Sequence, residues 1–306
     1  MNKKYLVRRL LIFPILLTGI ISFNPTAHAG FKPRVHRFAD EARVFVNAYL
    51  VETEKGIVAI DATLTVSDGK ALRANLEFLR KPLLAVLLTH GHPDHCNGLA
   101  ELIGTDGVPV ISTVGVDKAM KAHYDAAGEE RGRAMLGEEW PKKRIFPSKT
   151  LKDGESVTFG GVTFTVHDLG PGESPSDSYW LIEGEEKIAF IGDVVMNRVH
   201  AYLADGHSTQ WLKNIDRLKT ELKDVQRIYP GHGEPGSLEM LDWQKSYLET
   251  YRETVKSLAK GQPKLTDDAR QKLVTKMEEF LPNKRGEPFI AQGADAVAAE
   301  LAGEQK

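Results

Sequence analysis

The sequence has almost no cysteine. Cys96 is the only one among 306 residues, so the chain cannot form a disulfide within itself. Its stability must therefore come from the packing of a hydrophobic core, with a bound metal as a second source. Hydrophobic residues make up 42% of the chain and charged residues 27%, which is ordinary for a globular protein with a sizeable core.

An excess of basic residues is also missing. Lys and Arg total 40, and Asp and Glu total 42, so the formal charge is −2. Without the four basic residues Lys3, Lys4, Arg8 and Arg9, the formal charge would be −6. Binding to nucleic acid requires a basic face that neutralises phosphates. The composition therefore argues against a nucleic-acid partner and favours a small-molecule substrate.

No apolar run is long enough for a helix that spans a bilayer. The run from Leu10 to Ile21 is shorter than the roughly 20 residues that a span requires. It follows the basic start of the chain, and Ala27-His28-Ala29 has the small-x-small pattern of a signal peptidase site. We therefore predict that residues 1–29 are a signal peptide. The mature protein is expected to be periplasmic or secreted, without a stable membrane anchor.

The order of the apolar patterns predicts a layered α/β fold. Residues 44–51 and 57–60 are β-rich runs that favour a hairpin, and residues 67–79 have helical apolar spacing. Residues 83–88 form a continuous apolar run, which suits a strand buried on both faces. Strand pairs come first and are followed by strands mixed with helices, an order that is typical of α/β layers.

The C-terminal part of the chain has a different character. Residues 238–260 have helical apolar spacing and end at Gly261, and Thr266 can cap a further helix. We therefore divide the mature chain into a core domain at residues 30–237 and a helical extension at residues 238–306. Three roles of the extension stay open: it covers the cleft, it forms the interface of a homodimer, or its amphipathic helices simply pack against the core domain. Within the core domain, the polar residues 128–148 are interpreted as an excursion or lid.

Side chains that bind metals are concentrated in one short segment. His90, His92, Asp94 and His95 fall within six residues, directly after the apolar run 83–88. Imidazole and carboxylate are the ligands that suit zinc and its first-row neighbours. On an extended turn, His90 and His92 can face one way while Asp94 and His95 face another, so one loop can supply two metals. A polar turn with surface histidines is the alternative, and the density of ligands argues against it.

Two later residues are predicted to complete this site. Asp193 follows the apolar run 188–191, and His232 lies among glycines after the strand-like run 225–229. An Asp at a strand end is more often a turn former. With the histidine-rich segment present, however, we predict that both residues are ligands and that Asp193 can bridge two cations.

The histidine-rich segment and these two residues together resemble the metallo-β-lactamase superfamily, over roughly residues 44–236. The resemblance implies a four-layer αββα sandwich with the site at one edge, between the two sheets. It also implies two divalent metal ions, with zinc in first place and manganese or iron as alternatives. The implied ligands are His90 and His92 for the first metal, Asp94, His95 and His232 for the second, and Asp193 as the bridge.

One position departs from the pattern of the family. Glu173, in Gly170-Pro171-Gly172-Glu173, stands where the family has a third histidine for the first metal. A glutamate can still bind a metal, and its charge should raise the pKa of bound water and favour manganese or iron. The alternative is that Glu173 is no ligand. His167 lies six residues too early to replace the histidine. His123, His200 and His207 have no motif support as ligands, although His207 is a candidate for the cleft wall.

The resemblance implies a hydrolase in which a metal-bound hydroxide attacks a carbonyl carbon, with Asp94 orienting the nucleophile and accepting its proton. The expected substrate is a carbonyl ester, lactone, thioester or β-lactam amide. Efficient β-lactam turnover is not favoured, because Asp193 stands where B1 β-lactamases carry cysteine. The alternatives are a mono-iron sulfur-oxidising dioxygenase of the same fold, and a non-catalytic metal-binding protein in which Glu173 marks decay of the site.

Overall fold

The computed structural model describes residues 31–40 and 45–304, which form one compact unit. The predicted signal peptide at residues 1–29 lies outside these residues. The division at residue 238 and the localisation stay predictions.

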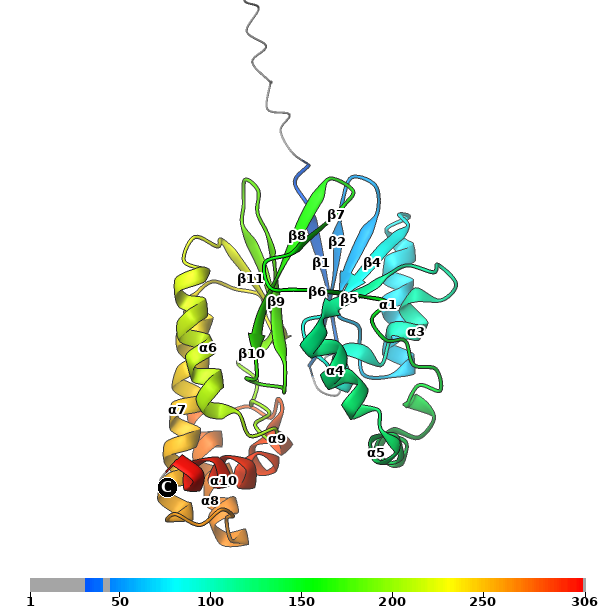
Figure 1. Cartoon of the computed structure of the whole chain (residues 1–306). Coiled ribbons are helices and arrows are strands. Elements are labelled where there is room, and N and C mark those ends of the chain that lie inside the picture. The colour runs from blue at the N-terminus through cyan, green and yellow to red at the C-terminus, as the bar shows by residue number, and fades with distance from the viewer. Residues whose placement is uncertain (1–30, 41–44, 305–306) are drawn as a thin grey trace, which may run out of the picture. The chain divides into compact units, whose positions relative to one another are not determined.

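The first sheet has six strands, and its antiparallel part consists of the predicted hairpin, β2 and β3, together with β1. Strands β3 to β6 are parallel. In sheet order the strands are β1 (Arg34–Ala39), β2 (Asn47–Glu52), β3 (Ile57–Ile60), β4 (Leu83–Leu87), β5 (Val110–Thr113) and β6 (Lys149–Leu151). Helices α1 (Val66–Phe78), α3 (Leu99–Ile103) and α4 (Val114–His123) lie on its outer face (Figure 1). Because helices cover that face, β2 and β3 are buried on both sides; β3 is wholly apolar, and β2 is apolar except at its two ends, Asn47 and Glu52.

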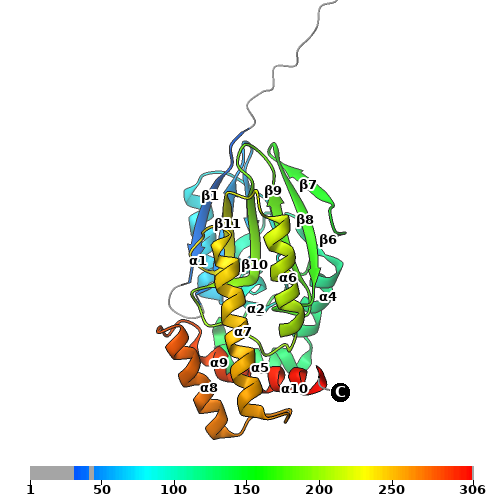
Figure 2. The same ribbon diagram turned by 90° about the vertical axis from the view of Figure 1, so that its left-hand side faces the viewer.

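The second sheet has five strands, of which only β10 and β11 are a parallel pair. In sheet order the strands are β11 (Arg227–Gly233), β10 (Ile188–Asn197), β9 (Asp177–Ile182), β8 (Val162–Gly170) and β7 (Ser156–Phe159). Helices α6 (Ser208–Glu221) and α7 (Glu239–Ala259) run along its outer face (Figure 2).

The two sheets pack face to face around a core of large apolar side chains. Tyr49 and Val58 come from the first sheet, and Phe164, Trp180 and Phe190 come from the second. All five side chains are buried. Complete burial of one such side chain stabilises the fold by about 1.5–3 kcal/mol. The predicted four-layer αββα sandwich is therefore confirmed, together with the helices that follow it.

The C-terminal helices are α8 (Asp267–Phe280), α9 (Glu287–Gln292) and α10 (Ala294–Glu304). The hydroxyl of Thr266 caps α8 by accepting from the amide of Ala269, as its sequence predicts. These helices share one hydrophobic core with the second sheet: Leu248, Leu273 and Val297 belong to the same buried cluster as Ile191 and are fully buried.

The interpretation of residues 128–148 as an excursion away from the core is wrong in part. This segment contains most of helix α5 (Ala126–Leu136) and the short helix η1 (Gly137–Glu139), and Trp140 is only 6% exposed. A Cβ atom on Gly132 would lie 2.3 Å from the Trp140 ring, so the glycine allows helix and indole to pack closely. Strands β1 and β6 and helix α9 were not expected; each is short and has little pattern of its own.

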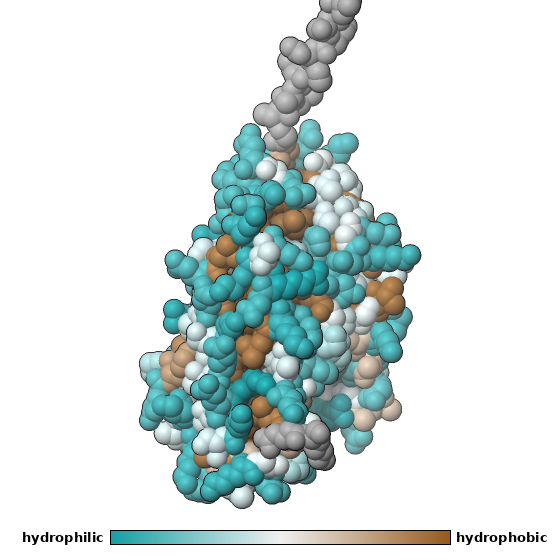
Figure 3. All heavy atoms as spheres, turned by 60° about the vertical axis from the view of Figure 1, so that its left-hand side comes forward, coloured by the Kyte–Doolittle hydropathy of each residue, from teal (hydrophilic) through white to brown (hydrophobic). Residues whose placement is uncertain are grey.

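The outer face over α6 and α7 is mostly hydrophilic, with hydrophobic residues in small separate groups (Figure 3). Among the described residues, no helix combines the length and apolar character needed to cross a bilayer. The homodimer interface proposed for the C-terminal helices stays a prediction.

Leu248→Ala should lower the free energy of unfolding by about 2–5 kcal/mol, because it opens a cavity where α7 meets the second sheet. Urea unfolding followed by circular dichroism measures this loss. Leu258→Ala, at a half-buried position of the same helix, is the matched control and should cost less. Since the C-terminal helices share one hydrophobic cluster with the second sheet, we expect one transition. Two separate transitions would contradict this view and favour an independent helical extension.

Candidate metal centre

The histidine-rich segment begins where strand β4 ends. His92 has extended backbone angles, φ −67° and ψ 148°, and is the N-cap of the single-turn helix α2 (Pro93–Cys96). Pro93 favours both features, because proline restricts the preceding residue to extended conformations and suits the first helical position. Asp94 and His95 lie on that single turn, so they project differently from His90 and His92. The local sequence thus separates the four side chains into two pairs.

Glu173 reaches the site from the loop between β8 and β9. The carboxylate of Asp177 holds this loop: it accepts from the amide of Glu173 at 2.6 Å and from the hydroxyl of Ser174 at 2.6 Å. Burial raises the pKa of Asp177 to about 7, against the opposing effect of the hydrogen bond from Ser174. The loop conformation therefore depends on buried hydrogen bonds rather than on exposed turn residues.

Asp193 and His232 come from the neighbouring strands β10 and β11, where the pairing register shifts on both sides of Gly192. A Cβ atom on Gly231 would lie 1.8 Å from Oδ1 of Asp193, so only glycine at position 231 allows this approach. The first sheet supports the same turn, because Tyr49 donates to the carbonyl of Pro230 at 2.5 Å. The two sheets thus fix Asp193 and His232 relative to each other.

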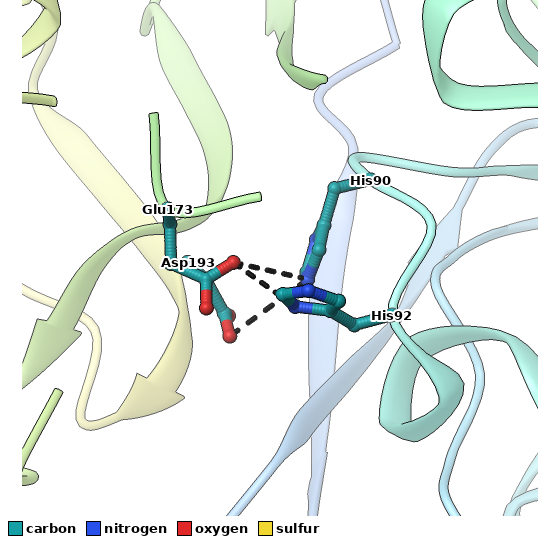
Figure 4. A group of neighbouring side chains, drawn as sticks. All are labelled: His90, His92, Glu173 and Asp193. Carbon is teal, nitrogen blue, oxygen red and sulfur yellow. Dashed lines mark ion pairs between the residues drawn. The ribbon is translucent and has the colours of Figure 1, made fainter. Parts of the chain in front are cut away.

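The first group of ligand-type side chains is His90, His92, Glu173 and Asp193, and all four are buried. Nδ1 of His92 lies 3.1 Å from Oε2 of Glu173, and Nε2 of His90 lies 3.7 Å from the same oxygen. Nε2 of His90 lies 3.8 Å from Oδ2 of Asp193. In Figure 4 the two histidines face the two carboxylates across a small gap.

The second group is Asp94, His95, Asp193 and His232, so Asp193 belongs to both groups. Nε2 of His95 lies 3.3 Å from Oδ1 of Asp193, and Nε2 of His232 lies 3.1 Å from Oδ2 of Asp193. Nε2 of His232 also lies 3.3 Å from Oδ2 of Asp94. The structure therefore brings together all seven side chains that the sequence predicts as ligands.

These distances fit a pair of cations. Ligands 2.0–2.1 Å from a tetrahedral ion lie roughly 3.3 Å from one another, close to the spacing in both groups. Several inward-facing atoms also have no hydrogen-bond partner among the described residues, namely Nε2 of His90, Nε2 of His95, Oδ1 of Asp193 and both carboxylate oxygens of Glu173. Buried polar atoms are rarely left in this state, so the donor set suits metal ions.

The electrostatics of the cluster agree with this fit. Burial raises the pKa of Glu173 well above its ordinary value, although His92 opposes the shift. Burial lowers the pKa of His232, but Asp193 and Asp94 outweigh that effect and raise it to about 10. Protons therefore partly neutralise the cluster when no cation does, and a cation that binds would displace them.

Two carboxylates that the sequence analysis did not single out hold the histidines in place. Asp61 accepts from the amide of Thr89 at 2.8 Å and lies 3.0 Å from Nδ1 of His95, which leaves Nε2 of His95 facing Asp193. Its backbone is in the left-handed region, at φ 58°. Asp61 directly follows strand β3, so its position at a strand end was a usable signal. Such carboxylates orient metal-binding histidines.

Asp205 plays the same part for the first group, since its Oδ2 lies 3.0 Å from Nε2 of His92. The loop that carries Asp205 leads into α6. The first amides of α6, from Ser208 and Thr209, donate to Glu300 of the last helix at 3.0 and 2.8 Å. A contact from the end of the chain therefore supports the position of Asp205.

The remaining histidines have separate roles. His123, which has no motif support as a ligand, lines the cleft, and its ring centre lies 5.0 Å from that of His92. His207 is not among the cleft-lining residues, whereas Asp205 is. His200 is buried against Tyr247, and His167 stacks on Tyr179 away from the cleft.

A cleft of about 460 Å³ opens over both groups. One wall comes from α5 and Trp140, with Met135 and Leu136 exposing apolar surface. The other wall includes Tyr202, Phe289 and Gln292. The last two lie on α9, so the helical extension lines the cleft. Such a cleft suits a small molecule with an apolar part.

A sequence model described as the metallo-β-lactamase superfamily matches residues 42–232, which is more than half of the chain. The chain belongs to the metallo-β-lactamase superfamily. Curated superfamily members of known reaction are among its relatives. One is a hydroxyacylglutathione hydrolase of Bdellovibrio bacteriovorus, 30% identical over 206 residues that cover 64% of this chain and 66% of the relative. Another is a linear primary-alkylsulfatase of a Pseudomonas species, 23% identical over 61% of this chain and 41% of the relative.

Solved structures of the superfamily share the fold. A metallo-β-lactamase from Pontibacter korlensis superposes with a TM-score of 0.56 at 20% identity, over 72% of this chain and 99% of that one. At this identity the likeness concerns the fold alone. The chain spans about two thirds of the hydroxyacylglutathione hydrolase and less than half of the alkylsulfatase.

Gly231→Ala should weaken metal binding by at least ~10-fold, because the new methyl group displaces the carboxylate of Asp193. Metal content after dialysis and zinc titration by calorimetry measure the effect. Gly184→Ala is the matched control, since its nearest contact would be the carbonyl of Glu186 at 3.8 Å. Unchanged zinc affinity in the Gly231 variant would contradict the assignment of Asp193.

Proposed function

We propose that the protein is a hydrolase that holds two divalent metal ions and cleaves a carbonyl ester, lactone, thioester or amide bond. Zinc is the first candidate metal, and the carboxylate of Glu173 would make the site accept manganese or iron more readily than a histidine would. The observation that carries the proposal is the pair of ligand groups that share Asp193 beneath the cleft. Membership of a superfamily with relatives named as hydrolases supports it.

In this proposal the seven ligand-type residues bind two different metal ions. His90, His92 and Glu173 would hold the first ion, and Asp94, His95 and His232 would hold the second, with Asp193 between them. When bound, the ions would lower the pKa of water and polarise the carbonyl group. Asp61 and Asp205 would keep two of the imidazoles in the required orientation.

Asp94 is the residue best placed to handle a proton. Its side chain is 18% exposed, against 1–3% for Glu173 and Asp193, and it lines the cleft. Burial alone would raise the pKa of Asp94, but His95 and His232 outweigh this and hold it well below its ordinary value. Asp94 is therefore ionised and can accept a hydrogen bond, so it would orient an attacking water; transfer of the water's proton to Asp94 is part of the proposal and does not follow from this pKa.

Two features bear on the competing functions. A second group of four ligand-type residues favours a two-metal hydrolase over a mono-iron sulfur-oxidising dioxygenase. The contacts of Asp205 with His92 and of the buried Asp61 with His95 favour an intact site over a decayed, non-catalytic one. Export to the periplasm or the medium remains part of the proposal and depends on residues 1–29.

The purified mature protein should contain two metal ions per chain and hydrolyse at least one member of a panel of esters, lactones, thioesters and β-lactams. His92→Ala should lower kcat/KM by at least about 100-fold, which corresponds to roughly 2.7 kcal/mol of transition-state stabilisation. His167→Ala, which removes a histidine outside the cleft, should retain activity. Full activity of the His92 variant, or of a preparation without metal, would refute the proposal.

Glu173→His should move the rise of activity to lower pH, by roughly one unit. The substitution replaces a carboxylate by a neutral imidazole, so the site becomes more positive and favours loss of a proton from water. Profiles of kcat/KM against pH measure the shift, and Glu173→Asp, which keeps the charge, should show little of it. An identical profile for the histidine variant would indicate that Glu173 binds no metal.

A further inference from the structure

Helix α5 presents one face to the cleft. The cleft-lining residues of this helix are Gly128, Arg131, Gly132, Met135 and Leu136. Their spacing of three and four residues places them on one side of an α-helix. Two of them are glycines and two are apolar. The charged member of the stripe is Arg131, whose side chain is exposed at the cleft.

Buried contacts fix the position of this helix. Glu129 accepts from Nε1 of Trp140 at 2.9 Å and from Nε of Arg144 at 2.7 Å. The Arg144 guanidinium lies 4.5 Å from the centre of the Trp140 ring, and Gly132 packs against the same ring. Arg131 is therefore carried by a well-supported helix rather than by a free loop.

Arg131 has no partner of opposite charge among the residues that the structure describes. Two other arginines of this region differ, because Arg133 and Arg144 both pair with Glu129. The carboxylates that line the cleft are engaged elsewhere: Asp94, Glu173 and Asp193 belong to the ligand groups, and Asp205 contacts His92. Arg131 is the only Arg or Lys among the cleft-lining residues.

An arginine in this setting suits an anionic oxygen group. The planar guanidinium can donate two parallel hydrogen bonds to a carboxylate, and it stays charged at any pH of interest. A single cation balances a single negative charge, so a carboxylate fits better than a doubly charged phosphate. Met135, Leu136 and Trp140 add apolar surface on the same wall, which suits a hydrocarbon segment beside the carboxylate.

We propose that Arg131 binds a carboxylate at the far end of the substrate, while the apolar wall of α5 and Trp140 packs against the chain that joins it to the scissile carbonyl. This inference rests on the proposed function and narrows its substrate class. Acyl compounds that carry a carboxylate are preferred over neutral esters and simple lactones. Arg131 determines specificity and takes no part in the chemical step.

The test compares p-nitrophenyl half-esters of adipate, suberate and sebacate with p-nitrophenyl hexanoate, octanoate and decanoate, on the metal-loaded enzyme. At one chain length, the half-ester should have a kcat/KM at least about tenfold higher, mainly through KM. Arg131→Gln should abolish this preference and leave the neutral esters within about twofold. Arg131→Lys should retain part of it. Arg133→Gln, on the same helix and outside the cleft, is the matched control and should behave as wild type.

Calorimetry with phenylbutyrate and its neutral analogue phenylbutanol provides a second measurement that needs no turnover. Arg131→Gln should weaken phenylbutyrate binding about tenfold and leave phenylbutanol binding unchanged. If both ester series are hydrolysed equally and the Arg131 variant changes neither series nor phenylbutyrate binding, the inference fails while the hydrolase stands. If no ester is hydrolysed but phenylbutyrate binding depends on Arg131, the anion site stands and the proposed function is in question.

Discussion

Three carboxylates and four imidazoles share one buried space, and this concentration of polar groups governs the rest of the structure. Groups of this kind are costly to bury unless a partner of opposite charge lies between them. The carboxylates of the cluster are Asp94, Glu173 and Asp193. Neutral imidazoles carry no positive charge, so the negative charges of these carboxylates must be balanced by bound protons or by metal cations. The carboxylates repel one another, so the fold must hold these side chains close together through contacts on several sides. The two sheets and the helices around them provide these contacts.

Hydrogen bonds from both sheets hold the ligand side chains in place. Asn47 and Tyr49 of the first sheet hydrogen-bond to the turn that carries His232 in the second. In the other direction, Ser178 of the second sheet donates to the carbonyl of Thr89, next to His90. Each sheet thus positions ligands that belong to the other. This exchange explains why the site lies at an edge where both sheets end rather than on either one alone.

The sequence predicted those site residues that have a signal in the local pattern. The histidine-rich segment, Asp193 and His232 follow strand-like runs, so their proximity could be anticipated, whereas Glu173 was placed at the site only by the resemblance to the family. Asp61 follows a strand as Asp193 does, but nothing in the local sequence shows that it faces Nδ1 of His95, and the contacts of Asp205 and His123 with His92 depend on tertiary packing. For the fold, the β2–β3 hairpin and the α8 cap were visible in the pattern. Strands β1 and β6 are short, and the α5 region is anchored by contacts of Trp140 that no local periodicity reveals.

The contact between Glu300 and the start of α6 has a practical consequence. The carboxylate of Glu300 accepts hydrogen bonds from the amides of Ser208 and Thr209. The loop just before these amides carries Asp205, which contacts His92. Helix α10 therefore helps to hold the loop beside His92 in position, in addition to packing on the surface of the sandwich. A truncation that removes Glu300 would therefore disturb the pocket through the start of α6, although Glu300 itself is not among the cleft-lining residues.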